Sequence, residues 1–352
     1  MSDSILSNRI RTFRRERQWS QKDLAAKSGI SRAEVSAVET GRQIPSTATA
    51  LRLAAVLEQP VEALFALPTP TEAPQWAWPP ELPSGRFWEA RVGARRLLFP
   101  SEPTALGSIA HDGRYGPDGI VRYEGSEPDR TLVVAGCDPA VGLLASELMA
   151  RDRIRLLPLT RGSRDALRLV ELGSVHAAGV HWSDDEREDA NNSMVARVLG
   201  SGYRLLHVTR WQEGVALEPS IRARSARAVK SARLRWIARE EGSGARHVLD
   251  RLLAGKAPRF RYHARDHRSV ALAIQSGYAQ AGIAVKMAAE EHGLDFVTLS
   301  HEDYDLCFSG ELKSTEPIVA LRAALKRSAL KRLTGDLPGL DVDRMGEERA
   351  VA

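Results

Sequence analysis

Apolar positions repeat at helical spacing in the N-terminal part of the chain. Leu24 and Ala25 mark the inner face of a short helix over residues 21–27, and Val35 and Val38 mark that of a second helix. Further apolar repeats predict two more short helices before residue 67. We therefore expect a small all-α bundle at this end of the chain.

The junction between the first two of these helices carries its own signals. Gly29 stands where a helix ends with a positive φ, which glycine adopts without strain. Ser31 is placed to cap the next helix, with Glu34 as its capping-box partner. Two short helices around a glycine turn predict a helix-turn-helix, whose second helix enters the major groove of DNA with its N-terminus first.

From Thr131 onwards the pattern changes to short apolar runs that alternate with amphipathic stretches. The first units are a strand over 131–136, a helix over 140–150, a strand over 154–159 and a helix over 163–172. Repeated units of this kind predict parallel sheets covered by helices on both faces. Ligands of such folds bind beyond the carboxyl ends of the strands.

A proline-rich stretch separates the two patterns. Six prolines lie between residues 67 and 83, which is typical of a semi-rigid linker. We expect Trp76, Trp78 and Trp88 to dock on the C-terminal part of the chain. The predicted domains are a helix-turn-helix domain over 1–66, a linker over 67–85, a small β-rich connecting region over 86–130 and a ligand-sensing domain over 131–347.

Charge and cysteine content change the picture in two respects. Residues 1–60 hold ten Lys and Arg against six acids, most of the net charge of +5 of the whole chain, which suits a surface that faces phosphates. The two cysteines are too few for a disulfide framework, and neither a secretory signal nor an apolar run of membrane-spanning length is visible. We expect a cytoplasmic protein without membrane contact.

The N-terminal residues also resemble a known family. The motif S-Q-x-x-L-A, followed by G-I-S and V-S-x-x-E-x-G-R-x-x-P-S, is similar to the helix-turn-helix of the lambda and Cro repressors and the xenobiotic-response-element (XRE) group. The resemblance implies binding to operator DNA as a homodimer or higher homo-oligomer. The implied DNA-contacting residues are Gln21, Ser31, Arg32, Ala33, Ser36 and Arg42.

A second resemblance rests on the order of the segments GCDPAVGLLASEL, RGSRDALRLVELGSVHAAGVHW, RWIAREEGSGARHVLDRLL and SVALAIQSGYAQAGIAV. These resemble the periplasmic-binding-protein-like domain related to molybdate-binding proteins, which occurs behind helix-turn-helix domains in bacterial regulators. The resemblance implies a type II fold, with two α/β lobes, two chain crossings and ligand in the cleft. We expect crossings near 200–203 and 299–304, between separate strands at 203–208, 215–217, 296–299 and 304–308.

Three strand-to-helix junctions, at 137–139, 161–163 and 241–246, offer free backbone N–H groups that together could hold an anion. The ligand-binding residues that the resemblance implies are Cys137, Asp138, Ser163, His181, Ser243, Gly244, Arg246 and Tyr304. Asp138 would oppose an oxyanion unless its carboxylate caps its own helix. Arg246 has the alternative of pairing with Glu240, Glu241 or Asp250.

Other kinds of site find little support. The nine histidines lack HExxH or comparable spacing, so we expect no metal site, and neither a G-x-S-x-G elbow nor a phosphate-binding glycine motif indicates an enzyme. We expect a ligand-responsive transcriptional regulator without a cofactor, whose effector is an oxyanion such as molybdate. The alternatives are a regulator that senses a small organic metabolite and a binding-protein component for solute uptake.

Overall fold

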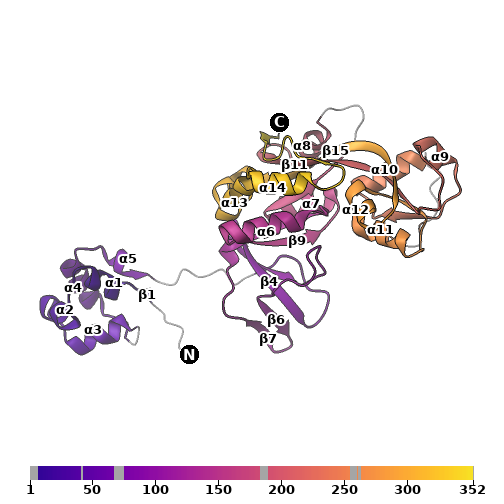
Figure 1. Ribbon diagram of the computed structural model, residues 1–352. Coiled ribbons are helices and arrows are strands. Elements are labelled where there is room, and N and C mark those ends of the chain that lie inside the picture. Colours follow the sequence, from indigo (N-terminus) through magenta and orange to yellow (C-terminus); the bar gives the residue numbers. More distant parts are fainter. Residues whose placement is uncertain are drawn as a thin grey trace. The chain divides into compact units, whose positions relative to one another are not determined.

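The computed structural model describes residues 7–40, 43–66, 75–182, 189–253, 260 and 263–351. The chain divides into two compact units, Met1–Ala73 and Pro74–Ala352, each with its own core (Figure 1). The first unit is helical, and the second is an α/β unit with two lobes. The predicted fold class is therefore confirmed.

The first unit is a bundle of short helices, closed by a two-stranded sheet between β1 (Ser7–Asn8) and β2 (Phe65–Ala66). Its helices are α1 (Ile10–Glu16), α2 (Gln21–Ser28), α3 (Arg32–Glu39), α4 (Thr47–Leu57) and α5 (Val61–Leu64). Leu24, Val35 and Leu53 are fully buried at its centre, from three different helices. The helical apolar spacing thus builds one shared core.

The turn between α2 and α3 has the predicted backbone. Gly29 ends α2 with a φ of +64°, and the Ser31 hydroxyl accepts a hydrogen bond from the Glu34 backbone N–H at 3.0 Å. The reciprocal half of the predicted capping box is replaced by another contact. The Glu34 carboxylate accepts a hydrogen bond from Thr49 Oγ1 at 3.0 Å, which fastens α3 to α4.

The second unit begins with a five-stranded sheet of order β3-β5-β4-β6-β7. Its strands are β3 (Gln75–Trp76), β4 (Gly85–Val92), β5 (Arg95–Pro100), β6 (Gly113–Gly116) and β7 (Gly119–Arg122). Trp76 packs on Phe87 and Trp78 on Phe99, both edge to face. Residues 67–74 of the predicted linker lie outside the described residues, and from Gln75 onwards the chain already belongs to this sheet.

The two lobes share a ten-stranded sheet whose main order is β13-β12-β14-β11-β15-β10-β8-β9. The first lobe holds β8 (Thr131–Gly136), α6 (Val141–Asp152), β9 (Arg155–Thr160), α7 (Ser163–Glu171), β10 (Ala177–Val180) and α8 (Ala190–Leu199). The second lobe holds α9 (Ala226–Ser231), β12 (Trp236–Arg239), α10 (Gly244–Leu253), β13 (His263–Ala264), α11 (His267–Gln275), β14 (Ala281–Val285) and α12 (Lys286–Glu291).

Alternating residues of a strand serve opposite faces of this sheet, as the twofold side-chain period requires. In β8, Leu132 and Val134 pack with α6, whereas Val133 and Ala135 pack with α7 and with the five-stranded sheet. Each lobe therefore has a core on both faces. This arrangement leaves the strand ends, where the two lobes meet, as the place for polar side chains.

Two long strands join the lobes, and here the sequence-based prediction was wrong. β11 (Tyr203–Leu217) and β15 (Asp295–Ser309) are continuous antiparallel strands of 15 residues each, where we expected two separate pairs. Both pass between the lobes where residues 209–212 pair with 301–304, so the first crossing lies well after the predicted 200–203. The pairing register shifts on either side of the crossing.

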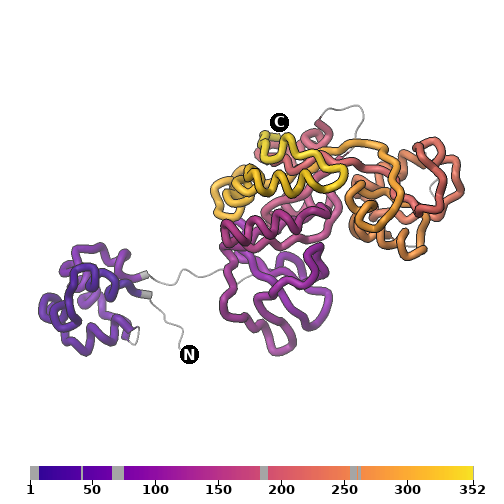
Figure 2. Tube along the Cα trace, viewed as in Figure 1, coloured from indigo at the N-terminus to yellow at the C-terminus, as the bar shows by residue number. Residues whose placement is uncertain are grey.

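The C-terminal segment returns to the first lobe. It holds α13 (Glu316–Ala324), α14 (Ser328–Gly335), β16 (Leu340–Asp341) and β17 (Glu348–Ala350). Ile318 and Leu321 of α13 pack with Leu148 of α6, and β17 pairs with the first-lobe end of β11. Figure 2 shows this yellow segment against the magenta first lobe.

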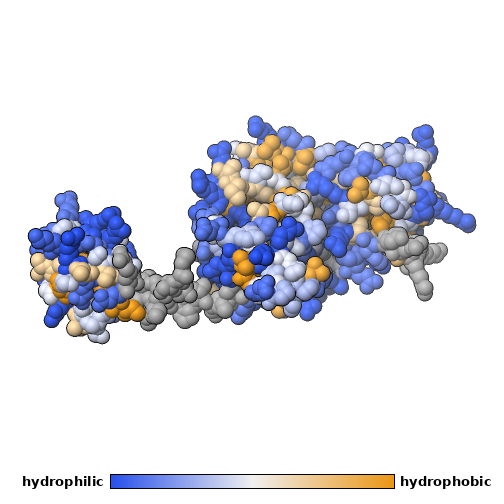
Figure 3. All heavy atoms as spheres, turned by 90° about the horizontal axis from the view of Figure 1, so that it is seen from below, coloured by the Kyte–Doolittle hydropathy of each residue, from blue (hydrophilic) through white to orange (hydrophobic). Residues whose placement is uncertain are grey.

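Hydrophilic residues predominate on the face of both units that Figure 3 shows, with apolar residues in small patches between them. Among the described residues, every helix is too short or too polar to cross a lipid bilayer.

Candidate functional site

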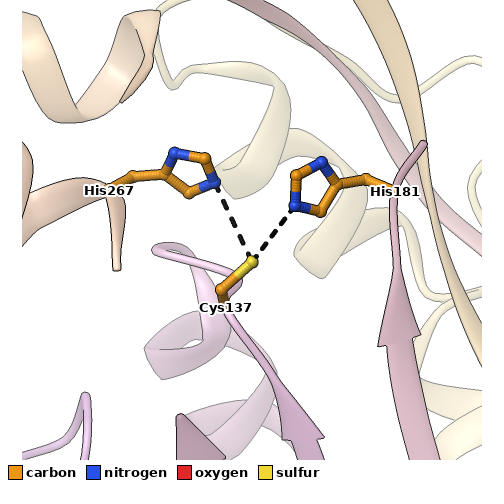
Figure 4. Close-up of side chains that lie close together, drawn as sticks. All are labelled: Cys137, His181 and His267. Atoms are coloured by element: carbon orange, nitrogen blue, oxygen red, sulfur yellow. Dashed lines mark hydrogen bonds between the residues drawn. The ribbon is translucent and has the colours of Figure 1, made fainter. Parts of the chain in front are cut away.

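A cysteine and two histidines meet at the border between the lobes. Cys137 follows β8 and His181 follows β10 in the first lobe, and His267 is the first residue of α11 in the second lobe. The distance from Cys137 Sγ is 3.3 Å to His181 Nε2 and 3.9 Å to His267 Nε2 (Figure 4). All three side chains are buried, so the second lobe completes a polar group that begins in the first.

Two carboxylates from the crossing strands join this group. Glu302 of β15 accepts a hydrogen bond from His181 Nδ1 at 2.8 Å, and both side chains are buried. Glu213 of β11 is also fully buried beside them. Burial and the charge of Glu302 raise the pKa of Glu213 well above its usual range, which favours its protonated form.

Arg239, at the end of β12, adds a buried cation with 1% of its surface exposed. Its Nε and Nη2 donate to the two oxygens of Glu240 at 2.9 and 2.8 Å. Its Nη1 lacks a hydrogen-bond partner within the described part of the chain. We call Cys137, His181, Glu213, Arg239, His267 and Glu302 the interlobe cluster.

The charges of the cluster depend on one another. Burial opposes ionisation of Cys137, but His181 and then Arg239 lower the pKa of its thiol below the ordinary value. Burial likewise opposes a charge on His181, yet Cys137 and Glu302 raise the pKa of its imidazole well above 6.5. Burial and Arg239 lower the pKa of His267 well below 6.5, so that ring is neutral. The cysteine and the histidine therefore favour each other's charged forms.

Aromatic rings form one wall of the cluster. Trp211 of β11 stacks on Tyr304 of β15 with ring centroids 4.7 Å apart, and the Trp211 ring lies 5.0 Å from that of His181. The Tyr304 side chain lies against the backbone of β10 at Gly179. A Cβ atom added at Gly179 would be 2.0 Å from the Tyr304 Oη, which is too close for any side chain. A glycine in β10 is therefore required for this wall.

A cavity of about 60 Å³ adjoins the cluster. Cys137, Asp138, His267, Arg268 and Tyr304 are among its lining residues, so it lies between the lobes. Such a volume holds a few water molecules or one small ion. The cavity and the cluster share Cys137 and His267, which makes this border the candidate site.

Of the predicted ligand residues, Cys137, Asp138, His181 and Tyr304 come together at this border. Asp138 Oδ1 accepts a hydrogen bond from the Ala140 N–H at 2.7 Å, so its carboxylate is tied to the turn before α6, and the helix itself begins without a side-chain cap. Burial nevertheless raises the pKa of Asp138 to about 6, which leaves it mostly charged at pH 7.

The other predicted ligand residues support the site or stand away from it. Ser163 bonds the backbone of His181 at 3.3 Å, and a Cβ at Gly244 would lie 2.7 Å from the ring of His181. The Ser243 hydroxyl accepts the Arg246 N–H at 3.2 Å and so caps α10. The Arg246 guanidinium pairs with Asp250 at 3.0 Å, which is the alternative foreseen for it, and it is not brought into the cluster.

Four cluster residues were absent from the sequence-based set: His267, Arg239, Glu213 and Glu302. His267 and Arg239 follow the same rule as Cys137 and His181, because each stands at the end of a strand or the start of a helix. That rule could have found them. Glu213 and Glu302 lie inside β11 and β15, where the sequence predicts loops between separate strands. Their polar side chains are the reason for that prediction.

The predicted DNA-contacting residues lie on one end of α3 and beside it. Ser31, Arg32 and Ala33 are exposed at the start of α3, and Ser36 is half-buried one turn later. Gln21 donates from Nε2 to Glu39 at 2.9 Å, so its amide is fixed at the start of α2. Arg42 lies outside the described residues.

Comparisons with known proteins give relatives for both units. Residues 10–64 match the family described as Helix-turn-helix. The "Uncharacterized protein YvgK" of Bacillus subtilis (strain 168) is 28% identical over 236 residues, which cover 63% of this chain and 75% of that protein.

Two solved structures are similar to more than half of the chain. One is a putative phosphate ABC transporter substrate-binding protein with bound phosphate from Clostridium perfringens, with 8% identity, a TM-score of 0.47 and coverage of 58% of this chain and 96% of that chain. Another is the tungstate ABC transporter from Geobacter sulfurreducens, with 13% identity, a TM-score of 0.42 and coverage of 58% and 98%.

Residues 145–326, which are more than half of the chain, match the family described as PBP superfamily domain. This match includes most of both lobes, and the helix-turn-helix precedes it in the same chain. A DNA-binding domain fused to a domain that binds small ligands supports a ligand-responsive regulator. The chain therefore belongs to the family of proteins with a PBP superfamily domain.

Proposed function

We propose that this protein is a cytoplasmic, one-component transcriptional regulator that binds operator DNA through α3 and holds a small effector between its two lobes. The interlobe cluster carries this proposal, because its reactive groups come from both lobes and are buried where the lobes meet. We propose a binding role for these groups, without catalysis.

Exposed residues at the start of α3 support the DNA-binding half of the proposal. Ser31, Arg32 and Ala33 are exposed where a recognition helix meets base edges, and Arg32 can give two hydrogen bonds to a guanine. The positive end of the α3 dipole adds attraction for phosphate. We propose that two copies bind as a homodimer to half-sites one helical turn apart, about 34 Å.

The cluster also suggests how an effector would act. His267 reaches Cys137 from the second lobe, so a ligand that contacts both stabilises the closed arrangement of the lobes. An effector shifts such an equilibrium only by its different affinity for the open and closed states. Closure would then alter how the two helix-turn-helix units of a dimer are presented to DNA.

The class of effector follows from the charges at the border. An oxyanion such as molybdate is what the sequence resemblance implies, and the unpaired Nη1 of Arg239 supports it. The Glu302 carboxylate and Asp138 weigh against it, because buried negative charges repel an anion. A small organic metabolite that carries one anionic group is the alternative within the same proposal.

The test of DNA binding begins with selection of an operator from random duplexes by the full-length protein. Binding is then titrated for the wild type, Arg32→Ala and the control Arg15→Ala, which removes the same charge from exposed α1. We expect Arg32→Ala to lose about 10- to 100-fold discrimination between operator and random DNA, equivalent to about 1–3 kcal/mol. Unchanged sequence preference in Arg32→Ala would contradict our placement of the recognition helix.

The test of effector binding uses the same duplex. Molybdate, tungstate, sulfate, phosphate and small organic acids are screened by thermal shift and by tryptophan fluorescence, to which Trp211 contributes from beside the cluster. An effector must both stabilise the second unit and change operator affinity. If ligands bind but operator affinity stays constant for each of them, the regulatory half of the proposal fails.

A further inference from the structure

We infer that Cys137, His181 and His267 form a binding site for a transition-metal ion that prefers thiolate and imidazole ligands, with Zn²⁺ as the first candidate. This inference rests on the proposed function only where it makes the ion an effector; the binding site itself stands on the geometry below. The three donor atoms come from two lobes and lie within 4.8 Å of one another.

The donor distances fit a tetrahedral ion. Zinc–sulfur and zinc–nitrogen bonds of about 2.3 and 2.05 Å at a tetrahedral angle place the sulfur and nitrogen roughly 3.6 Å apart. The observed Sγ–Nε2 distances of 3.3 Å to His181 and 3.9 Å to His267 lie on either side of this value. An adjustment of about 0.3 Å, within the reach of small side-chain rotations, therefore brings both sulfur–nitrogen distances to this value.

His181 already has the hydrogen bond that a metal-ligating histidine needs. Its Nδ1 is 2.8 Å from the Glu302 carboxylate, which holds the proton on Nδ1, so an ion that displaces the Nε2 proton meets the Nε2 lone pair on the side of Cys137. A carboxylate behind a histidine ligand fixes the orientation of its ring and increases its basicity. Both side chains are buried, so water does not compete for this hydrogen bond.

The charges around the site favour a cation over an anion. Arg239 is balanced by Glu240 through two hydrogen bonds, and an ion that displaces the protons of the Cys137 thiol and of His181 Nε2 leaves a thiolate and the Glu302 carboxylate to be neutralised. A divalent ion neutralises these two charges. Thiolate and imidazole select zinc or copper(I) over magnesium or calcium, which bind oxygen ligands.

A cavity beside the three donors leaves room for a fourth ligand of the ion. The cavity of about 60 Å³ is lined by Cys137 and His267, two of the three donors. A water molecule or a small ligand in this cavity could complete the coordination, as at zinc sites with three protein ligands. Because His267 alone comes from the second lobe, the ion would link the two lobes directly.

A second set of donors tests whether the assignment is correct. His181, Glu213 and Glu302 also lie within 4.8 Å of one another, on the Nδ1 side of His181. An ion there would need no sulfur and no residue from α11. Glu213→Gln therefore serves as a matched control, since it removes a donor of this second set and leaves Cys137 and His267 in place.

The experiment uses the full-length protein with Zn²⁺, and with Co²⁺ as the spectroscopic probe. The expected result for the wild type is one ion per chain, a sulfur-to-cobalt charge-transfer band, and one sulfur with two imidazoles in zinc X-ray absorption. Cys137→Ser should lose the band, and His267→Gln should bind Zn²⁺ at least tenfold more weakly. Glu302→Gln should lose 10- to 100-fold in affinity through the orientation of His181.

Two control variants show whether the loss of the band is specific to the three proposed ligands. Cys307→Ser, which removes the other buried cysteine, and Glu213→Gln should both keep the charge-transfer band. X-ray absorption on the wild type needs no variant, so it decides the question even if a buried variant fails to fold. A zinc environment without sulfur, or affinity that falls in Glu213→Gln but not in His267→Gln, would overturn the assignment.

The outcome for the proposed function is separate. If Zn²⁺ binds with these ligands while operator affinity is unchanged, the metal site stands and its role as effector fails. If the spectra show no sulfur-ligated ion but molybdate or an organic acid alters operator affinity, the metal site falls and the regulator remains.

Discussion

Asp305 offers a test of how firmly the C-terminal strand is held on the first lobe. Its buried carboxylate accepts a hydrogen bond from His207 Nδ1 at 2.9 Å and one from Arg349 of β17 at 2.7 Å. Burial alone would raise the pKa of Asp305, but the hydrogen bonds from His207 and Arg349 lower it from 3.8 to about 2. The charged form is therefore specifically stabilised in the folded state.

The magnitude follows from this shift. Each tenfold change in proton affinity is worth about 1.4 kcal/mol, so the charge of Asp305 contributes about 2 kcal/mol to the free energy of unfolding. A lowered pKa means that the unfolded chain binds the proton more tightly than the folded chain does. The contribution is thus complete above about pH 4 and is lost as the pH falls towards about 2.

Asp305→Asn removes the charge and keeps the shape of the side chain. We expect it to lower the free energy of unfolding of the second unit by about 2–4 kcal/mol at pH 7, because Arg349 and His207 lose a buried partner. Urea titrations at pH 7, 5, 4 and 3 measure the difference from the wild type. That difference should be constant down to about pH 4 and smaller at pH 3.

Asp189→Asn is the matched control. Asp189 pairs with the same Arg349, but 42% of its side chain is exposed, and asparagine can still cap α8 in its place. We expect a loss below about 1 kcal/mol, because exposed ion pairs contribute little. A difference between wild type and Asp305→Asn that stays the same from pH 7 to pH 3 would refute the electrostatic account.

Three further predictions concern local geometry and the division into units. Ser31→Ala should lower the stability of the helix-turn-helix unit by about 1 kcal/mol through the lost cap of α3, measured by thermal unfolding. Gly179→Ala should lower the stability of the second unit by about 1–3 kcal/mol and alter tryptophan fluorescence, because the added methyl collides with Tyr304. Gly142→Ala, in α6 with only an ordinary contact, should be neutral or slightly stabilising, and equal effects of the two changes would argue against the collision. A fragment Met1–Ala73 should fold by itself, as seen by circular dichroism, and bind the selected operator more weakly than the full chain; equal affinity would argue against dimer contacts in the second unit.

The helix-turn-helix was predictable because its determinants are local. The αL turn at Gly29 and the cap at Ser31 depend on backbone geometry within a few residues. The predicted hydrogen bond from the Ser31 backbone N–H to the Glu34 carboxylate is replaced by one from Thr49. Thr49 is 15 residues away from Glu34, so the local sequence does not reveal this partner. Even within a small unit, tertiary contacts decide between alternatives that local sequence leaves open.

The crossing strands were harder to predict because exposed and half-buried polar residues interrupt their apolar runs. Arg210, Gln212 and Asp303 interrupt the apolar runs of β11 and β15 in the way a surface loop would. The pairing of β11 with β15 runs through this interruption, as only the assembled sheet reveals. Glu213 and Glu302 escaped the prediction for the same reason.

The interlobe cluster has no spacing motif to find. Cys137 and His181 are 44 residues apart, and His267 is 130 residues from Cys137, so the fold alone makes them neighbours. What the sequence did indicate was the location, since Cys137 and His181 both follow buried strands. The expectation of no metal site depended on local spacing, which says nothing about donors from three separate junctions.

Trp211, Glu213, Glu302 and Tyr304 all stand on the two strands that join the lobes. Residues that pack against the proposed ligand site therefore belong to the strands that connect the lobes. A substitution that tightens binding at this place also changes the resting balance between open and closed forms. We expect related proteins with different thresholds to differ in these strands together with the register shifts beside them.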